Sequence, residues 1–267
     1  MILDNIKDRI DNFRGKIGIH YIDLNSGESC YAGNCDVFYA SGSVKIITLL
    51  EAFKWIEADK VRKDSKYVLK KSDYIGNKEK KIKTFGALEY LHEGIELTLE
   101  DLYRLSTSVS DNIAFNILFR MFGGEEINKT LDMLGFNKTR LHRAILDMKK
   151  IDKGIENYVS IKEMASLFYR MYKGQIISNR ASFEMLEILK EHQQNRIMPY
   201  YFDEELRIAH QTGIDNNLLM DMGIIYSKNP FVLCMAAEDS NTRNAESIMR
   251  DITLLCYRNS NKSGKTD

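Results

Sequence analysis

Apolar residues along this chain follow a strand-like pattern near both ends and a helical period over the long stretch between them. Strand patterns cover residues 16–24 and 29–32 and return at 206–211, 220–226 and 231–237. Helical patterns are found at 43–58, 98–108, 112–121, 125–134, 160–173 and 179–192, with terminal helices predicted over 2–14 and 241–257. A chain with this order closes by pairing its late strands with its early ones.

That order predicts an α+β fold of two lobes. We expect an antiparallel five-stranded sheet, flanked by the terminal helices, from residues 1–39 and 200–267. Residues 40–199 are predicted to form an inserted all-α lobe, and the two lobes one structural unit. The helix over 43–58 is apolar on more than one side, which indicates a central, buried position.

Composition narrows the function classes without naming one. Among 267 residues, 38 Lys and Arg balance 38 Asp and Glu, which argues against nucleic acid as a partner. No apolar run approaches the ~18–20 residues that a membrane span needs. The charged amphipathic start lacks the features of a secretory signal, so we expect a cytoplasmic protein, or an exported one if a leader was removed.

The four cysteines do not form a metal-binding pattern. They stand at 30, 35, 234 and 256, without a C-x-x-C pair or a histidine cluster at zinc spacing. We therefore expect no metal and no cofactor. Reduced core thiols are the favoured interpretation, and a hairpin disulfide between Cys30 and Cys35 is the alternative.

Three short motifs follow one another along the chain. They are residues 38–45 (FYASGSVK), which lead into the buried helix, residues 110–112 (SDN), and residues 210–213 (HQTG). Their order and spacing resemble the penicillin-recognising serine family, which includes class A β-lactamases and DD-peptidases and carries S-x-x-K, S-D-N and K-T-G. The resemblance extends over nearly the whole chain and implies a β-lactamase-like fold.

The resemblance assigns a role to each matching residue. Lys45 corresponds to the lysine that takes the nucleophile's proton, and Ser110 to the serine that relays a proton to the leaving nitrogen. Asn112 would orient the amide of the substrate side chain. Thr212 and Gly213 match the third motif, in which the lysine and threonine bind the substrate carboxylate.

The nucleophile is the first departure from the family pattern. Aligning Lys45 with the family lysine places Gly42 at the nucleophile position. Ser41 and Ser43 flank it, but one residue along a helix turns a side chain by ~100°. The oxyanion would be bound by the backbone N–H groups of Gly42 and Ile214, which do not need a side chain at residue 42.

Two further departures concern charge and deacylation. Gln211 replaces the lysine of K-T-G, and loss of a charge-assisted bond worth roughly 1.5–3 kcal/mol should weaken carboxylate binding by ~10–100-fold. Residues 139–143 lead into Ala144 and Ile145 where class A enzymes carry their deacylating glutamate. His210 abuts the third motif and is an open candidate for the pocket wall.

These departures predict a weak or inactive hydrolase that binds a β-lactam or a peptidoglycan-like peptide without acylation. One alternative is an active serine hydrolase that uses Ser41 or Ser43 with Lys45 as base. Another is a non-enzymatic interaction protein that uses the cleft or the basic segment 60–83, and a glycine introduced at residue 42 by engineering is a further one. We expect a monomer.

Overall fold

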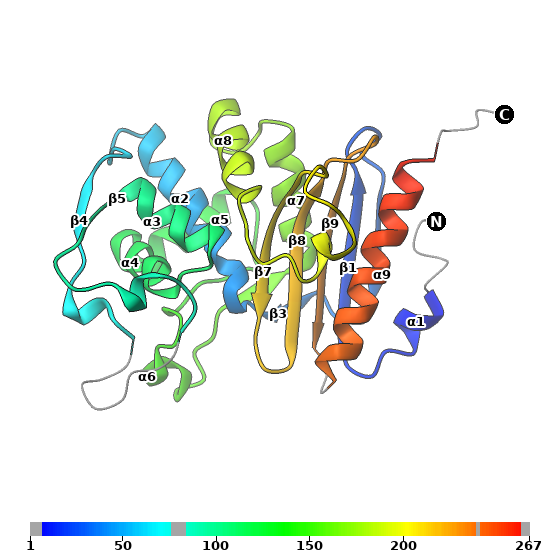
Figure 1. Cartoon of the computed structure of the whole chain (residues 1–267), viewed down its shortest axis with the longest axis horizontal. Helices are drawn as coiled ribbons and strands as arrows, with labels where there is room; N and C mark the ends of the chain where they lie inside the picture. The colour runs from blue at the N-terminus through cyan, green and yellow to red at the C-terminus, as the bar shows by residue number, and fades with distance from the viewer. Residues whose placement is uncertain (1–6, 76–83, 239–240, 263–267) are drawn as a thin grey trace.

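A five-stranded antiparallel sheet forms the centre of the computed structural model, which describes residues 7–75, 84–238 and 241–262. The strand order is β2-β1-β9-β8-β7, so the late strands do pair with the early ones. The strands are β1 (Lys16–Asp23), β2 (Ser29–Gly33), β7 (Ile208–Ile214), β8 (Leu218–Ile225) and β9 (Phe231–Glu238). The predicted α+β, β-lactamase-like architecture is confirmed (Figure 1).

Both faces of this sheet are buried, which explains why its strands are apolar nearly throughout. In β9 the residues Phe231, Leu233 and Met235 belong to one core cluster, whereas Val232 and Cys234 belong to the other. Helix α9 (Thr242–Ser260) covers the first face together with α1 (Lys7–Asp11), and α7 (Ile161–Tyr172) packs on the second. Alternate residues of a strand therefore enter two separate cores.

The helical part lies beside the β7 edge of the sheet (Figure 1). Its central helix α2 (Lys45–Glu57) begins directly after a short 3₁₀ turn over Ser41–Val44 and is buried along most of its length. The other helices are α3 (Leu99–Ser108), α4 (Asn112–Phe122), α5 (Gly124–Met133), α6 (Met148–Ile151) and α8 (Asn179–Leu189). Helix α2 contacts α3, α4, α5 and α8. This central position was predicted from the apolar residues on more than one side of the helix.

Several short elements differ from the prediction. The strand pairs β3 (Val37–Tyr39) with β6 (Tyr158–Ser160) and β4 (Lys66–Val68) with β5 (Glu96–Thr98) were not expected, because three residues give too short a pattern. The predicted helix over 2–14 spans Lys7–Asp11, and residues 1–6 lie outside the described part. Part of the basic segment, residues 76–83, also lies outside it.

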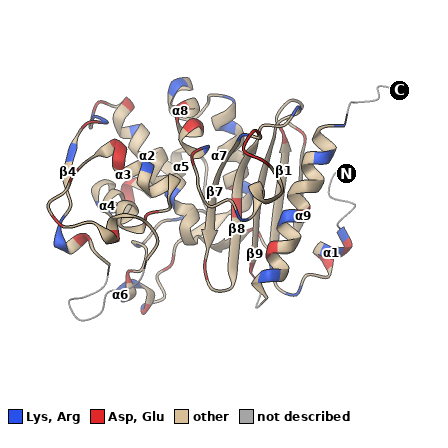
Figure 2. Ribbon diagram, in the orientation of Figure 1, with Lys and Arg blue, Asp and Glu red and all other residues tan. Residues whose placement is uncertain are grey.

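The predicted lobe boundaries stay a prediction, and one helix crosses them in its contacts. Helix α7 belongs to the range predicted as all-α, yet it packs against β1, β8 and β9. Basic and acidic residues are interspersed over both parts of the ribbon, while the sheet is almost free of them (Figure 2). The neutral net charge thus reflects mixing of the two signs.

The four cysteines, all within the described residues, are thiols, and Cys234 and Cys256 are buried. Burial raises the pKa of both buried thiols. In the described ranges no group of histidine, cysteine and acidic residues is arranged to hold a metal ion. No helix there is long and apolar enough to cross a bilayer.

Candidate active site

Lys45 is the buried cation at the start of α2. It is 1% exposed and lies between the 3₁₀ turn that precedes the helix and the segment before α4. Its Nζ donates to the carbonyl oxygen and Oγ of Ser110, at 2.7 and 2.6 Å, and to Oδ1 of Asn112 at 2.7 Å. The structure therefore joins the first and second predicted motifs through one lysine.

The protonation of Lys45 is balanced near neutrality. Burial lowers the pKa of its ammonium from 10.5 to about 7, and the nearby Asp111 carboxylate opposes this in part. A lysine with a pKa near 7 can give or take a proton at physiological pH, as a general base requires. Burial thus supplies the electrostatic condition for catalysis, whether or not a nucleophile is present.

Asp111 holds the second motif in place. Its Oδ1 accepts from the backbone N–H groups of Ile113 and Ala114, which caps α4. Its Oδ2 accepts from the N–H groups of Ala87 and Leu88 at 2.7 Å. Both oxygens of this fully buried carboxylate are thereby occupied, and the flanking Ser110 and Asn112 are presented to Lys45.

Residue 42 lies beside the amine of Lys45. A β-carbon built on Gly42 would be 3.7 Å from Lys45 Nζ and 3.2 Å from the carbonyl oxygen of Thr212. The flanking hydroxyls are bound elsewhere: Ser41 Oγ donates to the carbonyl of Ile214 at 3.0 Å, and Ser43 Oγ to that of Ala40 at 2.6 Å. Position 42 is thus the one of the three from which a side chain would start next to Lys45.

Strand β7 contributes its residues unequally. Thr212 and Ile214 line a cavity, together with Gly42, Lys45, Ser110 and Asn112. Gln211 and Gly213 are buried in the strand and do not line that cavity. His210 does not line it either, because its ring turns to Asp221, with Nδ1 2.8 Å from the carboxylate.

The cavity has a volume of about 520 Å³ and opens between β7, the segment before α4 and the loop before β6. Ile145 of that loop lines it, at the position where the resemblance places a deacylating glutamate. Its backbone is fixed by Asn116, which accepts from the N–H of Ile145 and donates to its carbonyl. The ion pair between Arg143 and Glu156 closes the base of the same loop. The loop is therefore ordered, with an apolar side chain facing the cavity.

Two residues of the site were missed in the sequence. His192 is buried with Nε2 2.9 Å from Thr212 Oγ1, and the same hydroxyl donates to Oε1 of Gln194 at 2.8 Å. Both residues follow the end of α8 at Leu189, although the helical pattern predicted over 179–192 extends to His192. A polar run after a helix is typical of any loop, so only the contact with Thr212 reveals their place.

Comparisons with known proteins bear on this arrangement. The sequence profile of the beta-lactamase enzyme family matches residues 2–260. Beta-lactamase VEB-1 of Pseudomonas aeruginosa is 23% identical over 274 residues, which cover 95% of this chain and 90% of the relative. The solved structure of PBP-A is similar at a TM-score of 0.84 with 22% identity, over 97% of this chain and 95% of that one.

A second solved structure gives the same fold. TLA-3 extended-spectrum beta-lactamase has a TM-score of 0.87 with 20% identity, over 98% of each chain. The fold has two lobes and a buried lysine in a cavity beside the sheet. These features are typical of the penicillin-recognising serine proteins that the motifs resemble. The chain belongs to the beta-lactamase enzyme family.

Proposed function

We propose that this chain is a β-lactamase-like protein whose cavity binds a β-lactam or a cell-wall-like acyl peptide without forming an acyl-enzyme at residue 42. The observation that carries the proposal is Gly42: the position beside Lys45 Nζ has no side chain to attack an acyl carbon. Loss of a catalytic nucleophile typically costs ~10⁶-fold in rate. The ligand class is supported by a PBP-A mutant whose solved structure is an acyl-enzyme complex with penicillin G.

The remaining groups are suited to reversible binding. Asn112 donates its amide to Thr84 at 2.7 Å and accepts from Lys45, so its orientation is fixed. Thr212 and Ile214 line the opposite wall. The alternative active hydrolase requires Ser41 or Ser43 to leave its carbonyl partner and turn toward Lys45.

Fluorescent penicillin, intact mass and calorimetry test the proposal together. Saturable heat of binding without a mass increase is the expected result. An adduct mapped to Ser41 or Ser43 would establish the active alternative instead. If the protein shows neither saturable binding nor an adduct, the ligand-binding proposal is overturned. That result would favour a non-enzymatic interaction protein.

Restoring the missing side chain is a gain-of-function test. Gly42→Ser combined with Gln211→Lys should yield a penicillin adduct. The β-carbon that carries the new hydroxyl would lie 3.7 Å from Lys45 Nζ, so the hydroxyl is next to the base. The adduct should persist, since Ile145 supplies no base for deacylation. Gln211→Lys alone is the control and should form no adduct. A double variant that folds but is not acylated would show that the cavity does not retain the family geometry.

A further inference from the structure

The hydroxyl of Ser110 faces the amine of Lys45. Its Oγ lies 2.6 Å from Lys45 Nζ, which is the one hydrogen-bonding neighbour of that oxygen among the described residues. Ser110 also lines the cavity. The hydroxyls of Ser41 and Ser43, at the start of α2, both donate to backbone carbonyl oxygens instead. Ser110 is therefore the serine of the site whose hydroxyl is next to an amine.

Hydrogen counting shows what this amine does when it is neutral. As an ammonium, Lys45 gives one hydrogen each to the Ser110 carbonyl oxygen, the Ser110 hydroxyl and Oδ1 of Asn112. As a neutral amine it keeps two hydrogens and gains a lone pair. Carbonyl and amide oxygens only accept, so the two hydrogens stay with them and the lone pair faces the hydroxyl. In that state Ser110 donates its proton toward Lys45.

The orientation of the Asn112 amide supports this count. Its nitrogen donates to Oγ1 of Thr84 at 2.7 Å, and its oxygen accepts from Lys45 at 2.7 Å. A flipped amide would direct its N–H hydrogens at the ammonium, which has no acceptor to offer. Ser110 is thus the proton donor among the three partners of the amine.

Lys45 is present in both forms near neutral pH. Burial lowers the pKa of its ammonium to about 7, and the Asp111 carboxylate opposes this in part. His192, after α8, also faces this charge, but burial holds the pKa of its ring well below the ordinary value. His192 is therefore neutral over the range in which Lys45 titrates. A base with a pKa near 7 can take a proton at physiological pH.

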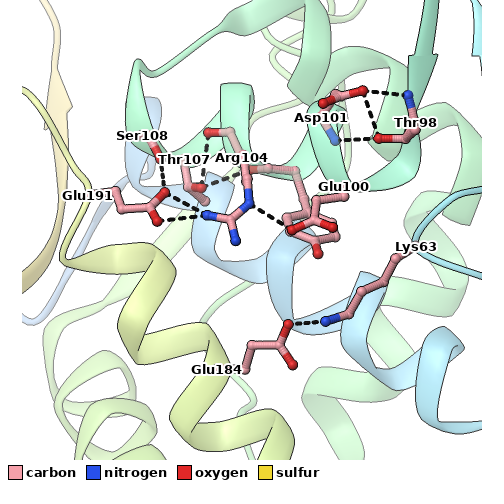
Figure 3. Close-up of polar contacts among 10 residues, drawn as sticks. Lys63, Thr98, Glu100, Asp101, Arg104, Thr107, Ser108, Glu184 and Glu191 are labelled. Carbon is pink, nitrogen blue, oxygen red and sulfur yellow. Dashed lines mark hydrogen bonds and ion pairs between the residues drawn. The ribbon is translucent and has the colours of Figure 1, made fainter.

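The backbone presents Ser110 in a strained conformation. Its φ is +57°, in the left-handed region that residues with a β-carbon rarely adopt. On the α3 side, Ser108 bonds Glu191, whose two carboxylate oxygens accept from Arg104 at 2.7 Å (Figure 3). On the α4 side, Asp111 accepts from four backbone N–H groups. These contacts hold the strained residue with its hydroxyl against the amine.

We propose that Ser110 and Lys45 form a nucleophile–base pair that takes the acyl group of a small activated ester. The proton of the Ser110 hydroxyl moves to the neutral amine, and Oγ forms a bond to the acyl carbon. The C–O bond of the ester breaks, and the departing alcohol oxygen takes the proton back from Lys45. The products are an acyl-serine at residue 110 and a free alcohol. The acyl-serine should persist, because Ile145 supplies no base for its hydrolysis.

This activity goes beyond the proposed function and does not require a β-lactam to react. The family resemblance places the acyl carbon of a bound β-lactam at the N–H groups of Gly42 and Ile214, and gives Ser110 the leaving nitrogen instead. A β-lactam held in that way does not bring its acyl carbon to Ser110. Ser110 is 4% exposed, so a compact acyl group is the kind that reaches its hydroxyl.

Acetylation by 4-nitrophenyl acetate tests the inference on the unaltered protein. Peptide mass mapping should find an acetyl group on Ser110 that hydroxylamine removes, whereas acetylated surface lysines form amides that hydroxylamine leaves in place. Acetylation of Lys45 or of another serine in place of Ser110, or stable amides alone, would overturn the inference. Penicillin calorimetry is read separately: a Ser110 adduct without penicillin binding would overturn the proposed function alone, and binding without the adduct would overturn this inference alone.

A matched pair of variants measures the role of the hydroxyl. Ser110→Ala should lower the rate of the hydroxylamine-labile acetylation by about a hundredfold or more, the usual contribution of a positioned base. Ser106→Ala is the control and should keep the rate within about twofold. Ser106 is a buried serine of α3 outside the cavity lining, and its Oγ has no partner among the described residues.

The pH profile of the unaltered protein decides the matter even if Ser110→Ala does not fold. Because only the neutral amine accepts a proton, the rate of Ser110 acetylation should rise about tenfold between pH 6 and 8 and then level off. A rate that continues to rise tenfold per pH unit to pH 9 would show that hydroxide, and not Lys45, removes the proton. That result would overturn the inference.

Discussion

Helix α2 and strand β7 each carry a residue from the expected motifs: Lys45 lines the cavity, and Gln211 is buried in the strand outside the lining. All three contacts of the Lys45 ammonium are short, and each of these acceptors belongs to the 110–112 segment. Gln211 is equally buried, yet it makes one 3.3 Å bond to the Thr212 carbonyl, and its Oε1 has no partner among the described residues. One buried polar group is thus fully satisfied and the other only partly.

This difference shows that a residue type used in catalysis can be retained in a site for a structural reason. Lys45 connects α2 to the start of α4 across the middle of the helical part, and this holds without any nucleophile at residue 42. Gln211 has no equivalent partner in the described part of the chain, so nothing in those surroundings requires that side chain. Retention of Lys45 is therefore weak evidence for hydrolysis, and stability measurements separate the two roles.

The largest effect is expected from removing the satisfied cation. Lys45→Met should lower the free energy of unfolding by about 3 kcal/mol, because three buried oxygens lose their donor at once. Urea denaturation measures it. Lys66→Met serves as the control, since Lys66 is exposed and pairs with Glu96 at the surface, and it should change little. Equal stability of the two variants would mean that Lys45 has no structural role.

The pH dependence of that difference is the next effect in size. Because the pKa of Lys45 is about 7 in the folded protein against an ordinary value of 10.5 in an unfolded chain, the unfolded chain binds more protons between these values. The contribution of Lys45 to stability should therefore rise with pH above 7, by up to about 1.4 kcal/mol per pH unit.

Denaturation of the unaltered protein and of Lys45→Met at pH 7, 8 and 9 isolates this slope, since other groups cancel in the difference. The difference in unfolding free energy should widen toward pH 9. A constant difference would show that Lys45 remains fully charged in the folded state and that the three acceptors outweigh burial.

Sequence reasoning reached an antiparallel sheet in which late strands pair with early ones, and the family resemblance named Lys45, Ser110 and Asn112, which the structure places in contact. Long strands and helices leave strong periodic patterns, and the motifs place chemically matched groups at the ends of such elements. Three-residue strand pairs such as β3 with β6 leave no pattern, because each strand is short and its partner lies more than 100 residues away.

The orientation of single polar groups was beyond the sequence. Gln211 was predicted to bind substrate, but the pleat of β7 buries it outside the cavity lining. The role of His192 depends on a backbone carbonyl, that of Thr107, and any residue type at 107 supplies a carbonyl. Such contacts depend on how α3 packs against the residues after α8. The sequence pattern does not predict that packing.

The smallest effect tests the unsatisfied side. Gln211→Met keeps the length of the side chain and removes a buried amide whose oxygen has no partner among the described residues, so the free energy of unfolding should rise by about 1 kcal/mol. Gln193→Met, at an exposed position whose backbone makes the contact to Ser108, is the matched control and should leave stability unchanged.

Because Gln211 does not line the cavity, its replacement should also leave ligand affinity within about twofold. A loss of stability or of binding in Gln211→Met alone would show that this glutamine is a functional part of the β7 wall, and the contrast with Lys45 would then fail.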